Sequence, residues 1–424
     1  MRVMTLTLDR PIPAVTGLHL RMVANLGLVR ACGLESQLAY VGAQGVKDSV
    51  GDATEVNLCH LADRVHYLGA RREISAVPIP FRMATKISPL VASALNRPIN
   101  TSPYSLRYDH LRTKFVELCL DQRIDFVVIP NTVVHWASSL RAAGFSTVCD
   151  AADVVSSLVE RQRATHSRSL IADVSLRLNV AACRAQERSG FAAVDELWVT
   201  SYGEAQEVAR RGHAVSTIVV PNVVAEPNAR VRARGRLFAV GMLATYSYEP
   251  NLDAARELAF ELAPILRGED PSMGVVLAGA GLSATQEREF RGAGVEILGQ
   301  VSTLDEFYDR IDVALLPIRT RGGLPLKLVE ALARSIPVVC TPQLIAGTPL
   351  RSGIDVMVGE SPYGIAMAVV SLRQDPRLAT LIGRAGRRAY ERHFSNSAAF
   401  TQLQARSVMT AAGRRVLTHD SAVA

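Results

Sequence analysis

The sequence predicts an α/β fold of two Rossmann-like domains that face each other across a cleft. Short runs of Val, Ile, Leu and Ala alternate along the chain with segments whose apolar residues recur every three or four positions. This alternation is typical of βαβ units around a parallel sheet that helices cover on both faces. With 424 residues and 48% apolar content, the chain is long enough for two domains of ordinary size.

In the first half, we expect the apolar runs to form seven strands. They are Val3–Leu8, Ser36–Val41, Val65–Gly69, Phe126–Pro130, Thr147–Asp150, Glu196–Thr200 and Thr217–Val220. Gly17 follows the first strand and precedes an amphipathic helix that we expect from about Leu18 to Arg30. Residues 223–235 are polar and follow neither periodicity, so we place the first domain at residues 1–222 and a linker at 223–235.

The second half is more regular, and its six runs predict a second parallel sheet in a domain at residues 236–385. The runs are Leu237–Gly241, Gly274–Gly279, Val295–Gly299, Asp312–Pro317, Ile336–Pro342 and Ile354–Val358. Helical spacing separates them, as in Leu252–Leu266 and Leu326–Arg334. The chain then stays amphipathic from about Pro376 to Met409, and we expect residues 386–424 to form a helical segment that packs back on the first domain.

The composition narrows the classes of function. No window approaches 18 uninterrupted apolar residues and the start is not a signal-peptide core, so we expect a cytoplasmic protein. Six scattered cysteines without a Cys-x-x-Cys pair indicate neither a zinc site nor a disulfide framework. The net charge of +7 comes with only 5% aromatic residues, which argues against a nucleic-acid partner.

One lysine stands out in the second half. The chain contains four lysines among 47 Lys and Arg residues, and Lys327 is the only one after residue 114. It follows a buried strand and a glycine-rich loop, close to Pro325, where we expect a helix to begin. An ammonium group near the positive end of a helix is suited to binding an anion such as a diphosphate, although a lysine on a surface helix also occurs by chance.

The neighbours of this lysine suggest a nucleotide site. Glu330 lies three residues later on the same helix face and can accept hydrogen bonds from ribose hydroxyls, or it simply complements the helix dipole. Gly322 and Gly323 allow the backbone to approach a ligand closely, unless the loop only requires positive φ angles. Arg319 and Arg321 are candidates for phosphate contacts, and solvated loop arginines are the alternative.

Two acidic residues near a strand end in the first half are candidate catalytic groups. Asp150 ends a predicted strand, and ligands of open α/β sheets bind at the carboxyl ends of strands. Asp153 follows in the next loop or first helical turn, where it is either catalytic or a helix N-cap. Gly17 lies in the turn between the first strand and the helix that follows it.

The block from Leu237 to Gly347 resembles the donor domain of the GT-B glycosyltransferases, in particular the retaining family 4, or group 1, enzymes. The resemblance implies that Lys327 binds and stabilises the donor diphosphate, that Glu330 binds the ribose, and that Gly241, after the first strand of this domain, lets backbone approach the diphosphate. The segments that carry it are Phe238-Ala-Val-Gly-Met242, Pro250-Asn251, Val276-Leu-Ala-Gly279, Leu298-Gly-Gln-Val301, Gly322-Gly-Leu-Pro-Leu-Lys-Leu-Val-Glu-Ala-Leu-Ala333 and Ile336-Pro-Val-Val339.

In the first half, Asp150-Ala-Ala-Asp-Val-Val-Ser156 is similar to an element of some bacterial polysaccharide-type sugar transferases. By this resemblance, Asp150 orients an acceptor hydroxyl or stabilises an oxocarbenium-like centre. The resemblance to the GT-B enzymes also implies that the loop at Gly17 faces the donor phosphates and the acceptor, unless it is a plain strand-to-helix turn. The implied enzyme is a hexosyltransferase that moves a sugar from a nucleoside diphosphate sugar to an acceptor hydroxyl, with retention, without a metal and without a cofactor besides this co-substrate. The acceptor is a glycan, a lipid-linked sugar or a small molecule.

Departures from the family pattern leave other functions open. Many members carry a glutamate where this chain has Gly322, and a customary phosphate cation is absent around Glu249-Pro-Asn251. A GT-B sugar-nucleotide epimerase and a catalytically silent GT-B-like partner protein are therefore alternatives. Residues 74–108 are basic and apolar, which makes them a candidate for contact with an anionic membrane surface or a lipid-linked acceptor, unless they form ordinary helices with solvated arginines.

Overall fold

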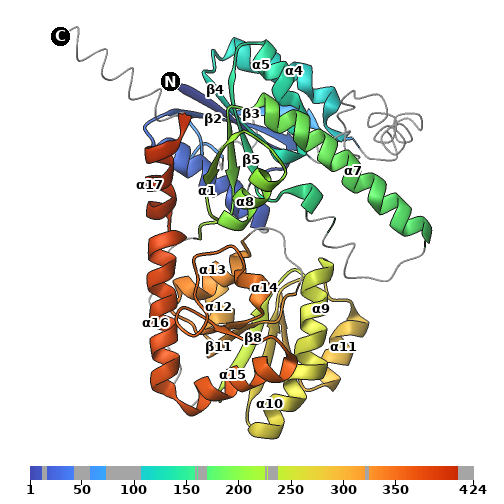
Figure 1. Cartoon of the computed structure of the whole chain (residues 1–424), viewed down its shortest axis with the longest axis vertical. Helices are drawn as coiled ribbons and strands as arrows, with labels where there is room; N and C mark the ends of the chain where they lie inside the picture. The colour runs from blue at the N-terminus through green and yellow to red at the C-terminus, as the bar shows by residue number, and fades with distance from the viewer. Residues whose placement is uncertain are drawn as a thin grey trace, which may run out of the picture. The chain divides into compact units, whose positions relative to one another are not determined.

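The structure, a computed structural model, describes residues 1–11, 17–42, 58–72, 107–157, 160, 170–224, 227, 237–319 and 324–408. The chain divides into two compact units, each built on a parallel sheet with helices on its faces (Figure 1). Unit 1 comprises Met1–Pro221 with Ala399–Ala424, and unit 2 comprises Asn222–Ala398. The α/β fold with two Rossmann-like sheets is the predicted one.

Unit 1 contains a seven-stranded sheet in its described residues, with the order β3-β2-β1-β4-β5-β6-β7 and parallel pairing throughout. The strands are β1 (Arg2–Thr7), β2 (Glu35–Gly42), β3 (Arg64–Ala70), β4 (Phe126–Pro130), β5 (Ser146–Ala151), β6 (Glu196–Val199) and β7 (Ser216–Val219). The helices are α1 (Gly17–Ala31), α4 (Arg112–Asp121), α5 (Ala137–Ala142), α7 (Leu170–Ala193) and α8 (Tyr202–Arg210), with 3-10 turns η3 (Asp109–Leu111) and η4 (Asn131–Trp136). Each predicted strand of this half is present.

The inner strand β1 has different packing on its two faces. Met4 and Leu6 point into a core that includes Phe115 and Trp136. Because side chains alternate along a strand, Thr5 and Thr7 point to the opposite face. Helix α1 contacts β1 and β2 on this second face, so the threonines lie beneath α1.

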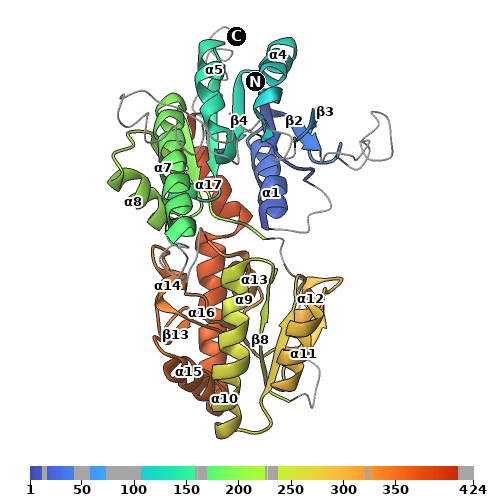
Figure 2. The same ribbon diagram turned by 90° about the vertical axis from the view of Figure 1, so that its right-hand side faces the viewer.

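Unit 2 contains a six-stranded parallel sheet in its described residues, with the order β10-β9-β8-β11-β12-β13 (Figure 2). The strands are β8 (Ala239–Leu243), β9 (Gly274–Ala278), β10 (Glu296–Gly299), β11 (Val313–Leu316), β12 (Val338–Cys340) and β13 (Met357–Val358). The helices are α9 (Glu249–Glu257), the π-helical η5 (Leu258–Leu262), α10 (Ala263–Glu269), α11 (Ala284–Gly292), α12 (Leu304–Tyr308), α13 (Leu326–Ala333), α14 (Pro342–Ile345), α15 (Pro362–Gln374), α16 (Pro376–His393) and α17 (Asn396–Arg406), the last of which runs into unit 1. The six predicted strands are present here as well.

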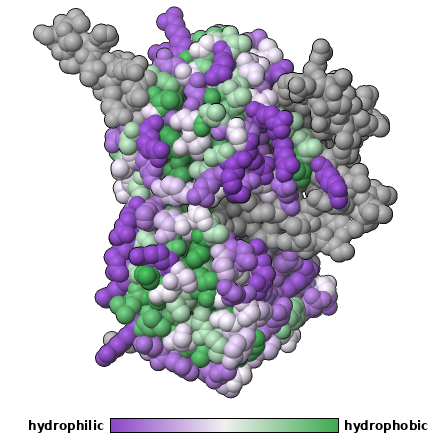
Figure 3. All heavy atoms as spheres, in the orientation of Figure 1, coloured by the Kyte–Doolittle hydropathy of each residue, from purple (hydrophilic) through white to green (hydrophobic). Residues whose placement is uncertain are grey.

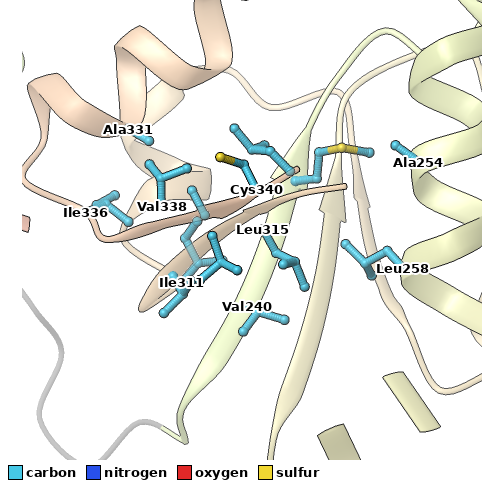
Figure 4. Close-up of a cluster of buried hydrophobic side chains, with 14 of the residues drawn as sticks. Val240, Ala254, Leu258, Ile311, Leu315, Ala331, Ile336, Val338 and Cys340 are labelled. Carbon is cyan, nitrogen blue, oxygen red and sulfur yellow. The ribbon is translucent and has the colours of Figure 1, made fainter. Parts of the chain in front are cut away.

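The core of unit 2 fixes the helix that carries Lys327. Val240, Leu315 and Val338 from neighbouring strands lie in one cluster with Ala331 of α13 (Figure 4). On its other side α13 packs closely against α16: a Cβ on Gly386 would lie 2.7 Å from Cδ2 of Leu332 in α13, and one on Gly383 would lie 2.3 Å from the carbonyl oxygen of Ser335, just after α13. Helix α13 is therefore held between the sheet and α16.

The predicted continuous amphipathic stretch after Pro376 forms two helices, α16 and α17. Ser395 separates them: its hydroxyl donates to the Glu391 carbonyl at 2.8 Å and accepts from the Ala398 amide at 3.2 Å. Beyond α17, the Ser407 hydroxyl and the Val408 amide both donate to buried Glu196 of β6, each at 2.8 Å. These contacts attach the end of the described chain to unit 1.

On the face that Figure 3 displays, hydrophobic and hydrophilic residues are interspersed in both units. Among the helices of the described residues, none combines the length and the apolarity that crossing a membrane requires. None of the six cysteines, all of which are among the described residues, forms a disulfide bond. Residues 74–108, the expected membrane-contact segment, lie outside the described residues except for Arg107 and Tyr108.

Candidate functional site

The candidate donor site is built on the first turn of α13 at the carboxyl edge of the unit 2 sheet. Pro325 precedes the helix in an extended conformation, and no side chain caps this end within the described residues. The Asn222 side chain donates to the Leu324 carbonyl at 2.6 Å and so fixes the approach to the helix. The N-terminal amides and the positive dipole end of α13 thus lie beside Lys327, which is in the first turn.

Lys327 is held by a residue from a distant part of the chain. Its Nζ donates to Oδ1 of Asn251 at 2.7 Å, and the Asn251 amide donates to the Thr245 carbonyl at 2.8 Å. Thr245 follows β8 and Asn251 lies in the first turn of α9, so the loop after β8 and the start of α9 orient the ammonium group together. Asn251 adds no compensating negative charge, because an amide is neutral.

Burial lowers the pKa of Lys327 from 10.5 to about 8, and the nearby Glu330 carboxylate opposes this shift. The lysine is half-buried, so its amino group loses part of its hydration in the ammonium form. A bound anion would favour the ammonium form and so raise the pKa of Lys327 again. The arrangement is therefore suited to an anionic ligand such as a diphosphate.

Glu330 lies deeper than the sequence indicated. It is buried, and its Oε2 accepts a hydrogen bond from the Tyr308 hydroxyl at 3.0 Å. Burial raises the pKa of Glu330, and the hydrogen bond from Tyr308 opposes this shift. Arg334 stacks over the Tyr308 ring, with 4.7 Å between its guanidinium carbon and the ring centroid. The predicted contact of Glu330 with ribose remains a prediction.

Arg319, a predicted phosphate ligand, is already engaged. Its guanidinium forms a two-pronged pair with Glu257, at 2.6 and 2.9 Å, and donates to the Glu360 carbonyl at 3.2 Å. The Glu257 carboxylate raises the pKa of Arg319. A phosphate contact would have to compete with this pair. The other candidates of the loop, Arg321, Gly322 and Gly323, lie outside the described residues.

Gly241 lies inside β8, and not after it as the resemblance implied. A Cβ at this position would lie 2.6 Å from the Val276 carbonyl oxygen and 2.8 Å from Ile311. The close packing of β8 within the sheet therefore explains this glycine, and the geometry gives no support to a role in approaching a diphosphate. Two glycines that follow β9, Gly279 and Gly281, make the close backbone approaches at this edge, with φ angles of 120° and 96°.

In unit 1, Asp150 of β5 forms a buried ion pair. Arg21 of α1 donates to both of its oxygens, at 2.5 to 3.2 Å, and Asn25 donates to Oδ2 at 2.8 Å. A third contact joins Arg21 to the Val220 carbonyl at 2.9 Å. These bonds occupy most of the accepting capacity of Asp150 and tie α1 to β5. Its catalytic role stays a prediction, as does the donor-binding role of Gly17, the first residue of α1.

Asp153 lies just after β5 in a loop that two buried carboxylates hold. Glu204 accepts from the Val154 amide at 3.4 Å, and Glu187 accepts from the Ser156 amide at 3.1 Å. Burial, together with the charge of Asp153, raises the pKa of Glu204 to about 7. Asp153 thus has an acidic neighbour on α8, and its carbonyl accepts from Asn131 at 3.0 Å.

Residues 236–375 match the family model described as glycosyl transferases group 1. This part of the chain is similar to the group 1 glycosyl transferases. The matched residues contain Lys327, Glu330 and Asn251 of the candidate donor site. No curated protein matches the chain.

Solved structures with the same fold are similar over the whole chain. Anabaena HepE in complex with UDP has a TM-score of 0.63 at 13% identity, over 95% of this chain and 98% of that one. Sucrose-phosphate synthase from Thermosynechococcus elongatus has a TM-score of 0.67 at 15% identity, over 99% of this chain and 100% of that one. TarM has a TM-score of 0.64 at 9% identity, over 94% of this chain and 97% of that one. These likenesses confirm the GT-B fold.

Sequence reasoning did not assign roles to Asn251, Tyr308, Arg21 and Asn25. Pro250-Asn251 was part of the resemblance, which was a usable signal for Asn251. The spacing of Arg21 and Asn25, four residues apart on one helix, places them on one face, but nothing in it identifies Asp150 as their partner. Tyr308 gave no signal.

Proposed function

We propose that the chain is a glycosyltransferase that moves a hexose from a nucleoside diphosphate sugar to an acceptor hydroxyl, with retention and without a metal. The observation that supports this most is the ammonium of Lys327, with a lowered pKa, at the N-terminal end of α13, within the residues that match the group 1 glycosyl transferases. As the glycosidic bond breaks, negative charge grows on the leaving diphosphate. The ammonium and the helix amides stabilise that charge, and such electrostatic stabilisation is commonly the largest contribution to catalysis.

UDP is the first nucleotide to test. The HepE structure holds UDP, and related structures of that protein hold UDP-glucose and glucose. In this chain, the diphosphate would lie at Lys327, and Asn251 would orient the ammonium group toward it. The hexose and the acceptor are to be identified by experiment.

The test is a thermal-shift panel of UDP, GDP, TDP, ADP and CDP on the wild type and on Lys327→Met. Methionine keeps the length of the side chain without its charge, so we expect nucleotide binding to be lost while the melting temperature of the free protein does not fall. Arg310→Gln removes one exposed positive charge from the same unit, where Arg310 pairs with Glu296, and serves as the control for net charge. A ligand at 100 times its dissociation constant stabilises by about 2.7 kcal/mol.

A shift with one nucleotide that disappears only in Lys327→Met supports the donor site. If no nucleotide stabilises the wild type, the donor site is ruled out and the silent-partner alternative is favoured. Incubation of the matching nucleotide sugar with candidate acceptors then separates a transferase from an epimerase, because an epimerase converts the donor alone. The anomeric configuration of the product and the rate in the presence of EDTA test retention and independence of metal.

A further inference from the structure

Tyr308, the last residue of α12, contacts both α13 residues of the candidate donor site. Its hydroxyl donates to Oε2 of Glu330 at 3.0 Å and to the Lys327 carbonyl at 3.3 Å. Tyr308 is 1% exposed and Glu330 is 5% exposed, so these hydrogen bonds are shielded from water. A hydroxyl from a separate helix therefore lies behind the first turns of α13.

The two carboxylate oxygens of Glu330 have different surroundings. Oε2 accepts the hydrogen bond of the Tyr308 hydroxyl. Oε1 accepts no hydrogen bond from the residues that the structure describes, and it is not one of the buried oxygens that lack a partner. Oε1 is therefore partly accessible, and it is the oxygen that a ligand hydroxyl can reach.

Arg334 holds the tyrosine ring in place. Its guanidinium stacks over the ring of Tyr308, and its Nε and Nη2 donate to Oδ1 of Asp305 at 3.0 and 2.9 Å. Its Nη1 donates to the Glu330 carbonyl at 3.3 Å. The Arg334 side chain is 8% exposed, so this stacked contact is largely desolvated and favourable. The four residues form one connected cluster.

The cluster favours the charged form of the Glu330 carboxyl. Burial raises the pKa of Glu330, whereas the hydrogen bond from Tyr308 and then the charges of Arg334 and Lys327 lower it. A charged acceptor forms hydrogen bonds about twice as strong as a neutral one. Tyr308 therefore influences both the direction and the strength with which Glu330 accepts a hydrogen bond.

We propose that Tyr308 is a positioning residue that determines selectivity for ribose over deoxyribose. It keeps Oε2 of Glu330 inside the unit, so that Oε1 faces outward as the acceptor for a ribose hydroxyl. The inference rests on the proposed function, because it requires a nucleoside diphosphate with its ribose at Glu330. Tyr308 acts through Glu330, so its effect should depend on the ribose hydroxyls.

The test is calorimetric titration of the wild type and of Tyr308→Phe with UDP, 2′-deoxy-UDP and 3′-deoxy-UDP. If another base gives the shift in the nucleotide panel, the same three forms of that nucleotide are used. Phenylalanine keeps the ring beneath Arg334 and removes only the hydroxyl. We expect the wild type to bind at least one deoxy analogue about tenfold to a hundredfold more weakly than the ribonucleotide, as for one hydrogen bond to a charged group.

This ratio of dissociation constants should fall about threefold or more in Tyr308→Phe, because the ribonucleotide loses affinity and the deoxy analogue does not. The hydroxyl of Tyr308 also contacts the backbone at Lys327, and a disturbance there would weaken all three nucleotides equally. The ratio therefore separates positioning of Glu330 from a general structural role.

Tyr390→Phe is the matched control. Tyr390 of α16 is also buried in unit 2, its hydroxyl donates to the Val224 carbonyl at 3.3 Å, and Arg387 lies over its ring at 5.1 Å. This variant should keep the wild-type ratio.

A double-mutant cycle tests whether Tyr308 acts through Glu330. Glu330→Gln should lower the ratio as well. The double variant Tyr308→Phe/Glu330→Gln should be no less selective than Glu330→Gln alone, because the two residues act as one unit.

A ratio that falls in Tyr308→Phe and in Glu330→Gln, but not in Tyr390→Phe, is the expected result. The inference is overturned if the wild type binds the three nucleotides equally, or if Tyr308→Phe weakens all three by the same factor. Should Tyr308→Phe melt below the assay temperature, the ratio in Arg334→Gln, which uncovers the ring, decides instead. Nucleotide binding without ribose selectivity overturns this inference alone, whereas the absence of any nucleotide shift overturns the proposed donor site and this inference with it.

Discussion

At the scale of single residues, the charge of Lys327 depends on pH in the range where enzymes are assayed. Burial lowers its pKa to about 8, so the free protein loses this proton between pH 7 and 9. A diphosphate binds the ammonium form, and binding therefore raises the pKa. The unfolded chain keeps the proton up to about pH 10.5, which means that the free protein gains stability from this residue as the pH rises from 8 to 10.5.

The first prediction follows from this linkage. We expect the dissociation constant of the nucleotide diphosphate to be constant from pH 7 to about 8 and then to rise about tenfold per pH unit, until the pKa of the complex is reached. Isothermal titration calorimetry across this range measures it. Lys327→Met should show no measurable binding at any pH in this range. A flat wild-type curve up to pH 9.5 would show that the ammonium of Lys327 does not contact the diphosphate.

The second prediction concerns Glu204, which also titrates near neutral pH. Burial, then the charge of Asp153, raises its pKa from 4.5 to about 7, while hydrogen bonds from Thr200 and Val154 oppose the shift. The folded protein thus holds a proton that the unfolded chain has released between these values. The contribution of Glu204 to the free energy of unfolding is therefore largest below pH 4.5, and it falls by about 3 kcal/mol as the pH rises to 7.

Urea unfolding of the wild type and of Glu204→Gln at several pH values between 5 and 8 measures this effect. The variant cannot titrate, so the free energy of unfolding of the wild type should fall relative to that of the variant as the pH rises. Burial also raises the pKa values of Glu187 and Glu196. The wild type and Glu204→Gln both retain these residues, so their contribution cancels in the difference between the two free energies of unfolding. A constant difference across this range would contradict the assignment.

The sequence identified residues by type better than by partner. Lys327 and Glu330 were predicted because a lone lysine at a helix start has a recognisable chemistry. The contact partners of the predicted residues were not predicted. Asn251 is 76 positions from Lys327 in the chain, and Arg21 is 129 positions from Asp150. Such pairs depend on which loops the folded sheet brings together, and this information is absent from local spacing.

At the scale of elements, the strands could be read from the sequence because most of their residues are buried and apolar, as in β4 and β11. The break between α16 and α17 could not. Both helices are amphipathic, and the separation rests on the side-chain hydrogen bonds of Ser395, which compete with the helical backbone. Gly241 shows the same limit, since close packing and ligand approach both select glycine.

The third prediction tests how α16 supports α13. Gly383→Ala places a methyl group against the Ser335 carbonyl, so we expect it to lower the free energy of unfolding by about 1–3 kcal/mol. Gly268→Ala is the control: this glycine is exposed in α10 and a Cβ would meet nothing within 4 Å, so alanine should stabilise by up to about 1 kcal/mol. Denaturant melts of both variants compare the two. Equal changes in the free energy of unfolding for the two variants would mean that α16 can shift to accommodate the methyl group without loss of stability.

At the scale of the whole molecule, the chain crosses from one compact unit to the other twice. The second crossing gives unit 1 a C-terminal segment, and its clearest attachment is Glu196 of β6. This carboxylate is fully buried and accepts from Ser407, from Val408 and from the Trp198 indole at 2.6 Å. Without the segment, a buried carboxylate would lose two of these three donors, which is costly for a charged group.

The last prediction is that deletion of Ala399–Ala424 destabilises unit 1 selectively. Hydrogen exchange monitored by mass spectrometry should become faster in β6, which holds Glu196, and should stay unchanged in β11 of unit 2. Ser407→Ala in the full-length chain removes one of the donors and should produce a smaller change in β6, corresponding to about 1–3 kcal/mol. If exchange rises equally in β6 and β11, the two units unfold as one; if it rises in neither, the segment does not stabilise unit 1. The selective result would show that the C-terminal segment belongs to unit 1 in energy as well as in contacts.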